Sequence, residues 1–190
     1  MTDPGAAIPS RTPSSRNSDD RLRERLGEIA RSLGGAVRPG LDMPVVEVVR
    51  ERWLDLARAL RAAIPYPFDV CACLTATDEW PREPRFRVVA HARASASNER
   101  VRLVTTAPGE DPRVASVAGV WPGANWMERE VYDLFGVAFD GHPDLRRILM
   151  PEGYGHHPLR KDFPIEGIEP DRLYREWERH RIAPPGGEAR

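Results

Sequence analysis

The segment from Trp121 to Pro164 places the strongest constraint on how this chain can fold, because a short amphipathic helix there runs directly into charge mixed with proline. This region holds two His-Pro dipeptides, beginning at His142 and His157, and leucine and basic residues follow each of them. A stretch of this composition has too few apolar side chains to bury itself. We therefore expect residues 137–190 to form an extended C-terminal arm that is held by another surface.

The helix that precedes this arm is predicted over residues 126–135. Asn125 suits the N-cap position, Glu128 would complete a capping box three residues later, and Gly136 suits the residue that follows the last turn. Its apolar arc consists of Met127, Val131, Leu134 and Phe135. Two carboxylates, Glu128 and Glu130, flank this arc. Arg129 and Asp133 are predicted to form an i,i+4 ion pair on the far face.

Upstream of this helix the chain reads as helices followed by strands. Helices are predicted over residues 19–33, 51–63 and 112–120, and strands over 45–49, 68–75, 85–92 and 101–106. Ile64 is expected on the buried face of the second helix, and the loop 94–99 should join the last two strands as an antiparallel pair. A final helix is predicted over residues 170–180. These elements predict an α+β fold, a two-layer sandwich of helices on a mostly antiparallel sheet.

This pattern divides the chain into three parts. Residues 1–18 are rich in Ser, Pro, Arg and Asp and are expected to be a disordered N-terminal tail. Residues 19–136 are expected to form the α+β sandwich domain, which ends in the helix predicted over residues 126–135. Residues 137–190 form the arm.

Charge and hydropathy narrow the classes of function. The formal net charge of −1 lacks the basic surplus of a nucleic-acid-binding domain. No segment approaches the roughly 20 apolar residues of a membrane span, and the N-terminus lacks the apolar core of a secretory signal. The chain is therefore expected in the cytosol or docked at the cytosolic side of a membrane.

The cofactor motifs that sequence can reveal are missing. The chain has 2 cysteines, whereas an iron–sulfur cluster normally needs four thiolates. It contains neither the glycine-rich phosphate loops nor the G-x-S-x-G elbow of hydrolases. Cys71 and Cys73, two residues apart on a predicted strand, are expected to share a face as core thiols. We expect no catalytic residue, metal or cofactor site in this chain.

Several side chains leave alternatives open. A metal site could draw on three histidines and three aspartates, although their spacing fits no zinc pattern: His142, His156, His157, Asp140, Asp144 and Asp162. The carboxylates of the predicted helix, Glu128, Glu130 and Asp133, form either a proton-handling set or a charged face. Half-buried carboxylates need arginine partners, which lie either within this chain or across an interface. The candidates within the chain are Arg146, Arg147 and Arg160. Trp121 and Trp126 belong either to the core or to an interface.

Three linked blocks carry a family resemblance. E-R-E-V-Y-D-L-F-G at residues 128–136, G-H-P-D-L-R-R-I-L at 141–149 and H-P-L-R-K-D-F-P at 157–164 resemble the signature of the C subunit, or thirty-kilodalton subunit, of proton-translocating NADH–quinone oxidoreductase, respiratory complex I. The chain departs from the family pattern before the second His-Pro, where Tyr154, Gly155 and His156 stand in place of an aromatic residue, any residue and Gly. If that position needs a positive φ, His is less suited to it than Gly.

The resemblance implies a peripheral subunit without a redox centre of its own, on the cytoplasmic side of the cell inner membrane and attached to it only through the complex. FMN and iron–sulfur clusters would lie on other subunits, and NADH and quinone would be bound elsewhere in the complex. The implied partners are the homologue of the D subunit and the iron–sulfur subunits, on which the arm would dock. The implied interface residues are Glu128, Arg129, Glu130, Asp133, His142, Arg146, Arg147, His157, Arg160, Lys161 and Asp162. The alternatives are the homologous subunit of a membrane-bound nickel–iron hydrogenase-type complex and a stand-alone metal-dependent enzyme.

Overall fold

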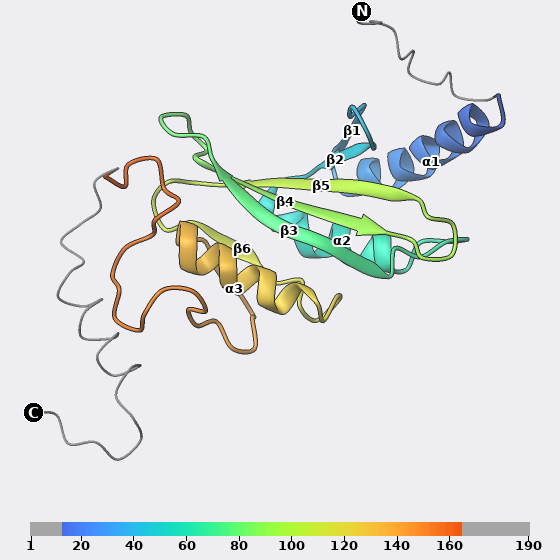
Figure 1. Cartoon of the computed structure of the whole chain (residues 1–190). Helices are drawn as coiled ribbons and strands as arrows, with labels where there is room; N and C mark the ends of the chain where they lie inside the picture. The colour runs from blue at the N-terminus through green and yellow to red at the C-terminus, as the bar shows by residue number, and fades with distance from the viewer. Residues whose placement is uncertain (1–12, 165–190) are drawn as a thin grey trace, which may run out of the picture.

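The computed structural model of the chain describes residues 13–164, and side chains from residue 19 onward (Figure 1). Its elements, in chain order, are α1 (Pro13–Ser32), β1 (Ala36–Arg38), β2 (Val45–Glu47), the 3-10 helix η1 (Arg50–Arg52), α2 (Trp53–Arg61), β3 (Val70–Asp78), β4 (Phe86–Arg93), β5 (Arg100–Ala107), β6 (Arg113–Ala115), α3 (Ala124–Phe135) and β7 (Ala138–Asp140). The helix predicted over 170–180 and the first 12 residues of the predicted N-terminal tail lie outside the described residues.

The main sheet has five strands in the order β1-β2-β5-β4-β3. Neighbouring strands are antiparallel except β2 and β5, which run parallel. The hairpin of β4 and β5 closes through the loop at 94–99, as predicted. β6 and β7 form a separate parallel pair. With α2 packed on the sheet and α1 beside it (Figure 1), the predicted α+β class is confirmed.

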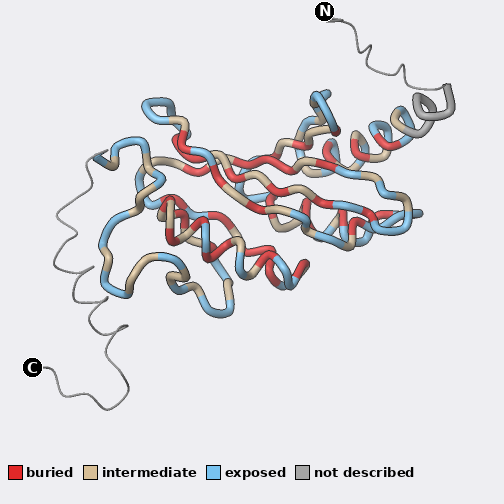
Figure 2. Tube along the Cα trace, in the orientation of Figure 1, coloured by how far each residue is buried: buried red, intermediate tan, exposed pale blue. Residues whose placement is uncertain are grey.

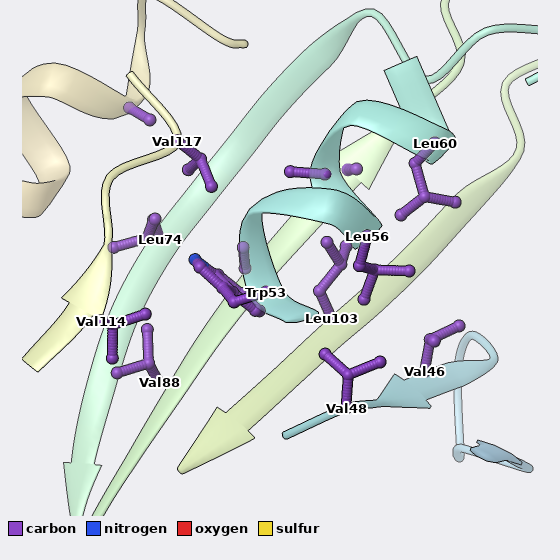
Figure 3. Close-up of a cluster of buried hydrophobic side chains, with 14 of the residues drawn as sticks. Val46, Val48, Trp53, Leu56, Leu60, Leu74, Val88, Leu103, Val114 and Val117 are labelled. Atoms are coloured by element: carbon purple, nitrogen blue, oxygen red, sulfur yellow. The ribbon is translucent and has the colours of Figure 1, made fainter. Parts of the chain in front are cut away.

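The core forms where the alternating strands meet the apolar stripe of α2. Trp53 lies at its centre and is fully buried (Figure 3). Val88 of β4 and Leu103 of β5 face it from the sheet, and Val117 approaches from the segment after β6. Burying a large apolar side chain contributes about 1.5–3 kcal/mol relative to exposure. This shared cluster therefore ties the β6–α3 segment to the sheet.

α1 begins at Pro13, earlier than predicted, and ends at the predicted glycines. Its apolar stripe faces the core through Leu22 and Leu26, both buried. Gly34 adopts φ 69°, and the N–H of Gly35 donates to the carbonyl oxygen of Ala30 at 2.8 Å. This is the hydrogen bond of a glycine-terminated helix.

Three local predictions are wrong. The segment 112–120 is not a helix, because Val114 and its neighbours pair with β7 as strand β6. Ile64 is 82% exposed, since α2 ends at Arg61 and the chain turns before it. Cys71 and Cys73 pair with Ala92 and His91, which face opposite sides of β4, because a β-bulge shifts the register between the two cysteines.

α3 covers the open edge of the main sheet. β3 is the last strand in the order, so its outer backbone groups have no neighbouring strand. The N–H of Leu74 meets the Sδ atom of Met127 at 3.0 Å, and Val131 and Phe135 bury themselves on the same side. Within residues 13–164, none of the helices has the length and apolar character needed to cross a bilayer.

Candidate functional site

Residues 141–162 of the C-terminal arm lie on α3, and Figures 1 and 2 show this part of the chain looping around that helix as a mixture of exposed and half-buried residues. One attachment of the arm to α3 runs through Asp133, whose side chain is fully buried. One of its oxygens accepts from the backbone N–H groups of Ile148, Leu149 and Met150 at 3.0, 2.7 and 2.8 Å. The other accepts from Arg147 Nη1 at 2.7 Å. Desolvation raises the pKa of Asp133, but these donors outweigh it and leave the pKa below its ordinary value.

The second His-Pro block caps the C-terminal end of α3. The last carbonyls of a helix have no partner within the helix. Here the oxygen of Asp133 accepts from His157 Nδ1 at 2.9 Å, that of Leu134 from the N–H of Leu159 at 3.0 Å, and that of Phe135 from Arg160 Nε at 2.6 Å. A cation at this end is also favoured by the helix dipole. The second His-Pro block therefore supplies the hydrogen-bond donors that the last carbonyl groups of α3 lack within the helix.

Residues 161 and 162 of the arm are bonded to the β3–β4 hairpin. Arg85 donates to both oxygens of Asp78, at 2.9 and 2.7 Å, and to both oxygens of Asp162, at 2.9 and 2.7 Å. The N–H of Lys161 also donates to Asp78, at 2.8 Å. Burial raises the pKa of the Asp78 carboxyl, but Arg85 and the backbone donors outweigh burial and hold the pKa at about 2.

Glu128 does not form the predicted capping box. α3 begins earlier than predicted, with Gly123 at the N-cap position, so Asn125 lies inside the helix. The fully buried Glu128 instead accepts from Ser116 Oγ at 2.6 Å and from the N–H of Val117 at 2.7 Å. Burial raises the pKa of Glu128 to about 7 despite these two hydrogen bonds. The carboxyl therefore joins α3 to the segment after β6.

Arg129 and Asp133 do not form the predicted ion pair, and their face of the helix is not solvent-exposed. The arm covers it, so Arg129 is 6% exposed and donates to the carbonyl oxygen of Arg146 at 3.1 Å. The guanidinium also stacks over the ring of Trp126, 4.7 Å from its centroid. Trp126 itself stays 64% exposed, whereas Trp121 is buried and donates to the carbonyl oxygen of Phe68 at 2.8 Å. The two tryptophans therefore divide between surface and core.

The predicted interface residues fall into three groups. Glu128, Arg129 and Asp133 are buried inside the chain. The half-buried residues are His142, Arg147, His157 and Arg160, and the side chain of His142 itself has no exposed surface. The exposed residues are Glu130, Arg146, Lys161 and Asp162. The buried group cannot present its side chains to another subunit without the arm moving. Of the buried group, Arg129 and Asp133 bond to the arm and attach it to α3, whereas Glu128 joins α3 to the segment after β6.

His142 and Asp144, two of the residues considered for a metal site, make local contacts. His142 Nε2 donates to the carbonyl oxygen of Asn125 at 3.1 Å, and Asp144 pairs with Arg146 at 2.9 Å. Among residues 13–164 no group of three or more His, Cys, Asp or Glu side chains is placed to hold a metal ion. The positive φ of the turn before the second His-Pro falls on Gly153, at 86°, so His156 does not need the conformation that would disfavour it.

Sequence reasoning missed Asp78, Arg85 and Ser116. Arg85 and Asp162 are separated by 77 positions, and no spacing rule connects them. A usable signal was Asp78 itself, a carboxylate at the end of an apolar strand, because buried carboxylates need cationic partners.

Gly136 offers a direct test of the arm's fit. It adopts φ 75°, and an added Cβ would meet Arg160 Nη2 and His157 Nε2, both at 2.5 Å. We expect Gly136→Ala to lower the free energy of unfolding by more than the about 1–2 kcal/mol of the left-handed conformation alone, as measured by urea denaturation. Gly34→Ala is the control, since it adopts φ 69° but nothing lies within 4 Å of its Cβ position. Equal losses in both variants would show that the arm does not press on Gly136.

Comparison with known proteins gives consistent matches. The family model described as the 30 Kd subunit of respiratory-chain NADH dehydrogenase matches residues 46–169. The C subunit of NADH-quinone oxidoreductase from Geobacter sulfurreducens is 46% identical over 128 residues, covering 67% of this chain and 76% of that protein. The protein of the same name from a Roseiflexus species is 42% identical over 161 residues, covering 82% and 90%.

Solved structures agree on the fold. A trypsin-resistant fragment of Nqo5 is 36% identical with a TM-score of 0.58, and the alignment covers 66% of this chain and 99% of the fragment. A chain of the membrane-bound sulfane sulfur reductase, an archaeal respiratory membrane complex, aligns over 91% of this chain and 97% of its own length with a TM-score of 0.66. At 22% identity, this second likeness concerns the fold alone.

Proposed function

The chain belongs to the 30 kDa subunit family of respiratory-chain NADH dehydrogenase, and on that premise we propose that it is a peripheral-arm subunit of an NADH–quinone oxidoreductase that acts in assembly and docking. In this role it carries no redox centre and no catalytic residue of its own. Electron transfer from NADH to quinone, coupled to proton translocation, would take place on the other subunits of the complex.

One observation supports a docking role above the others. Residues 141–162 bond to α3 and to the β3–β4 hairpin, yet α3 and these residues leave large apolar side chains in solvent. Trp126 is 64% exposed, Leu149 60% and Leu159 50%. Exposed aromatic and aliphatic side chains on an ordered surface are typical of protein interaction sites, with Trp and Arg enriched among the residues that dominate binding.

The partners follow from the family premise. We propose that the homologue of the D subunit and the iron–sulfur subunits cover this surface, and that Glu130, Arg146, Lys161 and Asp162 form charge-assisted contacts at its rim. FMN and the iron–sulfur clusters would be held by other subunits. The chain would reach the cytoplasmic face of the inner membrane only through the complex.

We also propose that the chain divides functionally near Gly136, into the sandwich domain and the docking arm. The trypsin-resistant fragment of Nqo5 supports this division by its extent, because its alignment covers 66% of this chain, which is about the length of the proposed domain. The arm's exposed basic residues, among them Arg146 and Lys161, are potential trypsin sites.

Co-purification tests the proposal. The chain would be tagged, the membranes dissolved in mild detergent and the captured proteins identified. A large assembly with iron–sulfur subunits and NADH-dependent quinone reduction is expected. Nickel–iron subunits in its place would move the chain to the hydrogenase-type complex, and capture of the chain alone would contradict both assignments.

Trp126→Ala should separate docking from stability. The ring is largely exposed, so the melting temperature of the isolated chain should change little beyond the loss of the Arg129 stacking contact, worth about 0.5–1 kcal/mol. Loss of an interface Trp typically weakens binding by about 2 kcal/mol or more, so recovery of the assembly should fall roughly tenfold or further. Leu41→Ala, in the exposed turn between β1 and β2, is the matched control. Unchanged assembly by the Trp126 variant would remove α3 from the docking surface.

A further inference from the structure

Glu128 and His142 form a buried pair that the arm and the domain share. Glu128 lies on α3 and His142 on the arm, both side chains are fully buried, and Glu128 Oε2 lies 3.9 Å from His142 Nε2. A pair of this kind is either an ion pair or a neutral pair, and the surrounding hydrogen bonds decide which.

The hydrogen bonds of the ring indicate a neutral histidine. The N–H of Asp144 donates to His142 Nδ1 at 3.0 Å, so that nitrogen must carry a lone pair. Nε2 lies 3.1 Å from the carbonyl oxygen of Asn125, which can only accept, so the proton sits on Nε2. Protonating the ring would break the bond from Asp144.

Within residues 19–164, the groups around Glu128 supply hydrogen bonds but no arginine or lysine. On the β6 side Ser116 Oγ accepts from the N–H of Ala118 at 3.2 Å, which leaves its hydroxyl proton to donate to Glu128. On the β3 side the nearby titratable group is the Cys71 thiol, whose pKa is raised chiefly by burial and further by the charge of Glu128. Among residues 19–164, no Arg or Lys forms an ion pair with Glu128. A buried carboxylate without a cation favours its protonated form.

We propose that Glu128 and His142 are a proton-binding site, in which Glu128 holds the proton beside a neutral His142, and that the proton strengthens the attachment of the arm to α3. Removing the proton leaves a buried negative charge that is relieved when water reaches it. The ring of His142 lies on the arm, so admitting water there loosens the arm. The site belongs to the chain itself and operates in whatever complex the chain joins.

The direction of the pH effect follows from the two states. The pKa of Glu128 is about 7 in the folded chain and 4.5 when unperturbed. Between these values the folded chain binds a proton that the unfolded chain has released. The free energy of unfolding therefore falls as the pH rises, and the contribution of this proton is gone above about pH 7. From pH 5.5 to 8 this group alone should raise the unfolding equilibrium constant about 30-fold.

The experiment measures unfolding of the full-length chain by urea at both pH values. The matched pair is Glu128→Gln and Glu130→Gln, because Glu130 lies two positions along the same helix but is exposed. We expect the 30-fold dependence to vanish in Glu128→Gln and to persist in Glu130→Gln. Persistence in both variants would overturn the proposal.

Nuclear magnetic resonance on the wild-type chain gives a second readout if Glu128→Gln does not fold. The side-chain carboxyl carbon of Glu128 should titrate near pH 7, and the ring nitrogens of His142 should report the tautomer that carries its proton on Nε2. A charged imidazole beside an ionised Glu128 at pH 6 would show an ordinary ion pair and refute the proton site.

Discussion

Asp133→Asn is expected to lower the free energy of unfolding of the full-length chain by about 3–5 kcal/mol, the range for breaking a buried ion pair. The amide keeps one acceptor where the carboxylate receives three backbone N–H groups and Arg147. Arg147, whose side chain is only 15% exposed, is then left without its anion. Urea denaturation at pH 7 measures the loss, and trypsin cleavage after Arg146 and Arg147 should become faster.

Asp144→Asn is the control within the same arm. Its carboxylate pairs with Arg146 at 2.9 Å, but both side chains are more than half exposed, so the variant should show little change. If Asp133→Asn were as stable as this control, the arm would be held by its apolar contacts and not by the carboxylate.

Arg85→Met is expected to have the second large effect, about 3 kcal/mol or more, because Asp78 would stay buried without a cation. The Asp78–Arg85 pair also makes the free energy of unfolding depend on pH. Its pKa is about 2, below the ordinary 3.8, so the stabilisation is complete above about pH 4 and is lost as the pH falls toward 2. A shift of this size corresponds to about 2 kcal/mol. Unfolding at pH 7 and pH 3 should show that this acid sensitivity shrinks in the variant.

Arg113→Met is the matched control for Arg85→Met. Arg113 also bridges two aspartates, Asp111 and Asp140, but on the surface. Solvent screens such pairs, so stability should change little. Comparable losses in the two variants would mean that burial does not distinguish the two bridges.

Much of the domain was predictable because its signals are local. The apolar stripe of α1, the glycines at its end and the alternation along β4 each depend on residues a few positions apart. The failures occurred where a distant partner overruled the local pattern. Residues 113–115 became a strand because β7 was available to pair with them. Glu128 has no capping role because α3 begins at Ala124, and its carboxyl bonds instead to Ser116, 12 positions away.

For the candidate site, the sequence alone determined which segment matters, which family it resembles and that its charges need partners. Only the tertiary structure decided that Asp133 is bonded within the chain, that Trp121 is buried while Trp126 is exposed, and that Asp162 meets Arg85. The physical reason is that ion pairing and burial depend on distance in space. A 77-position separation in sequence carries no information about that distance until the sheet and α3 have brought the two ends together.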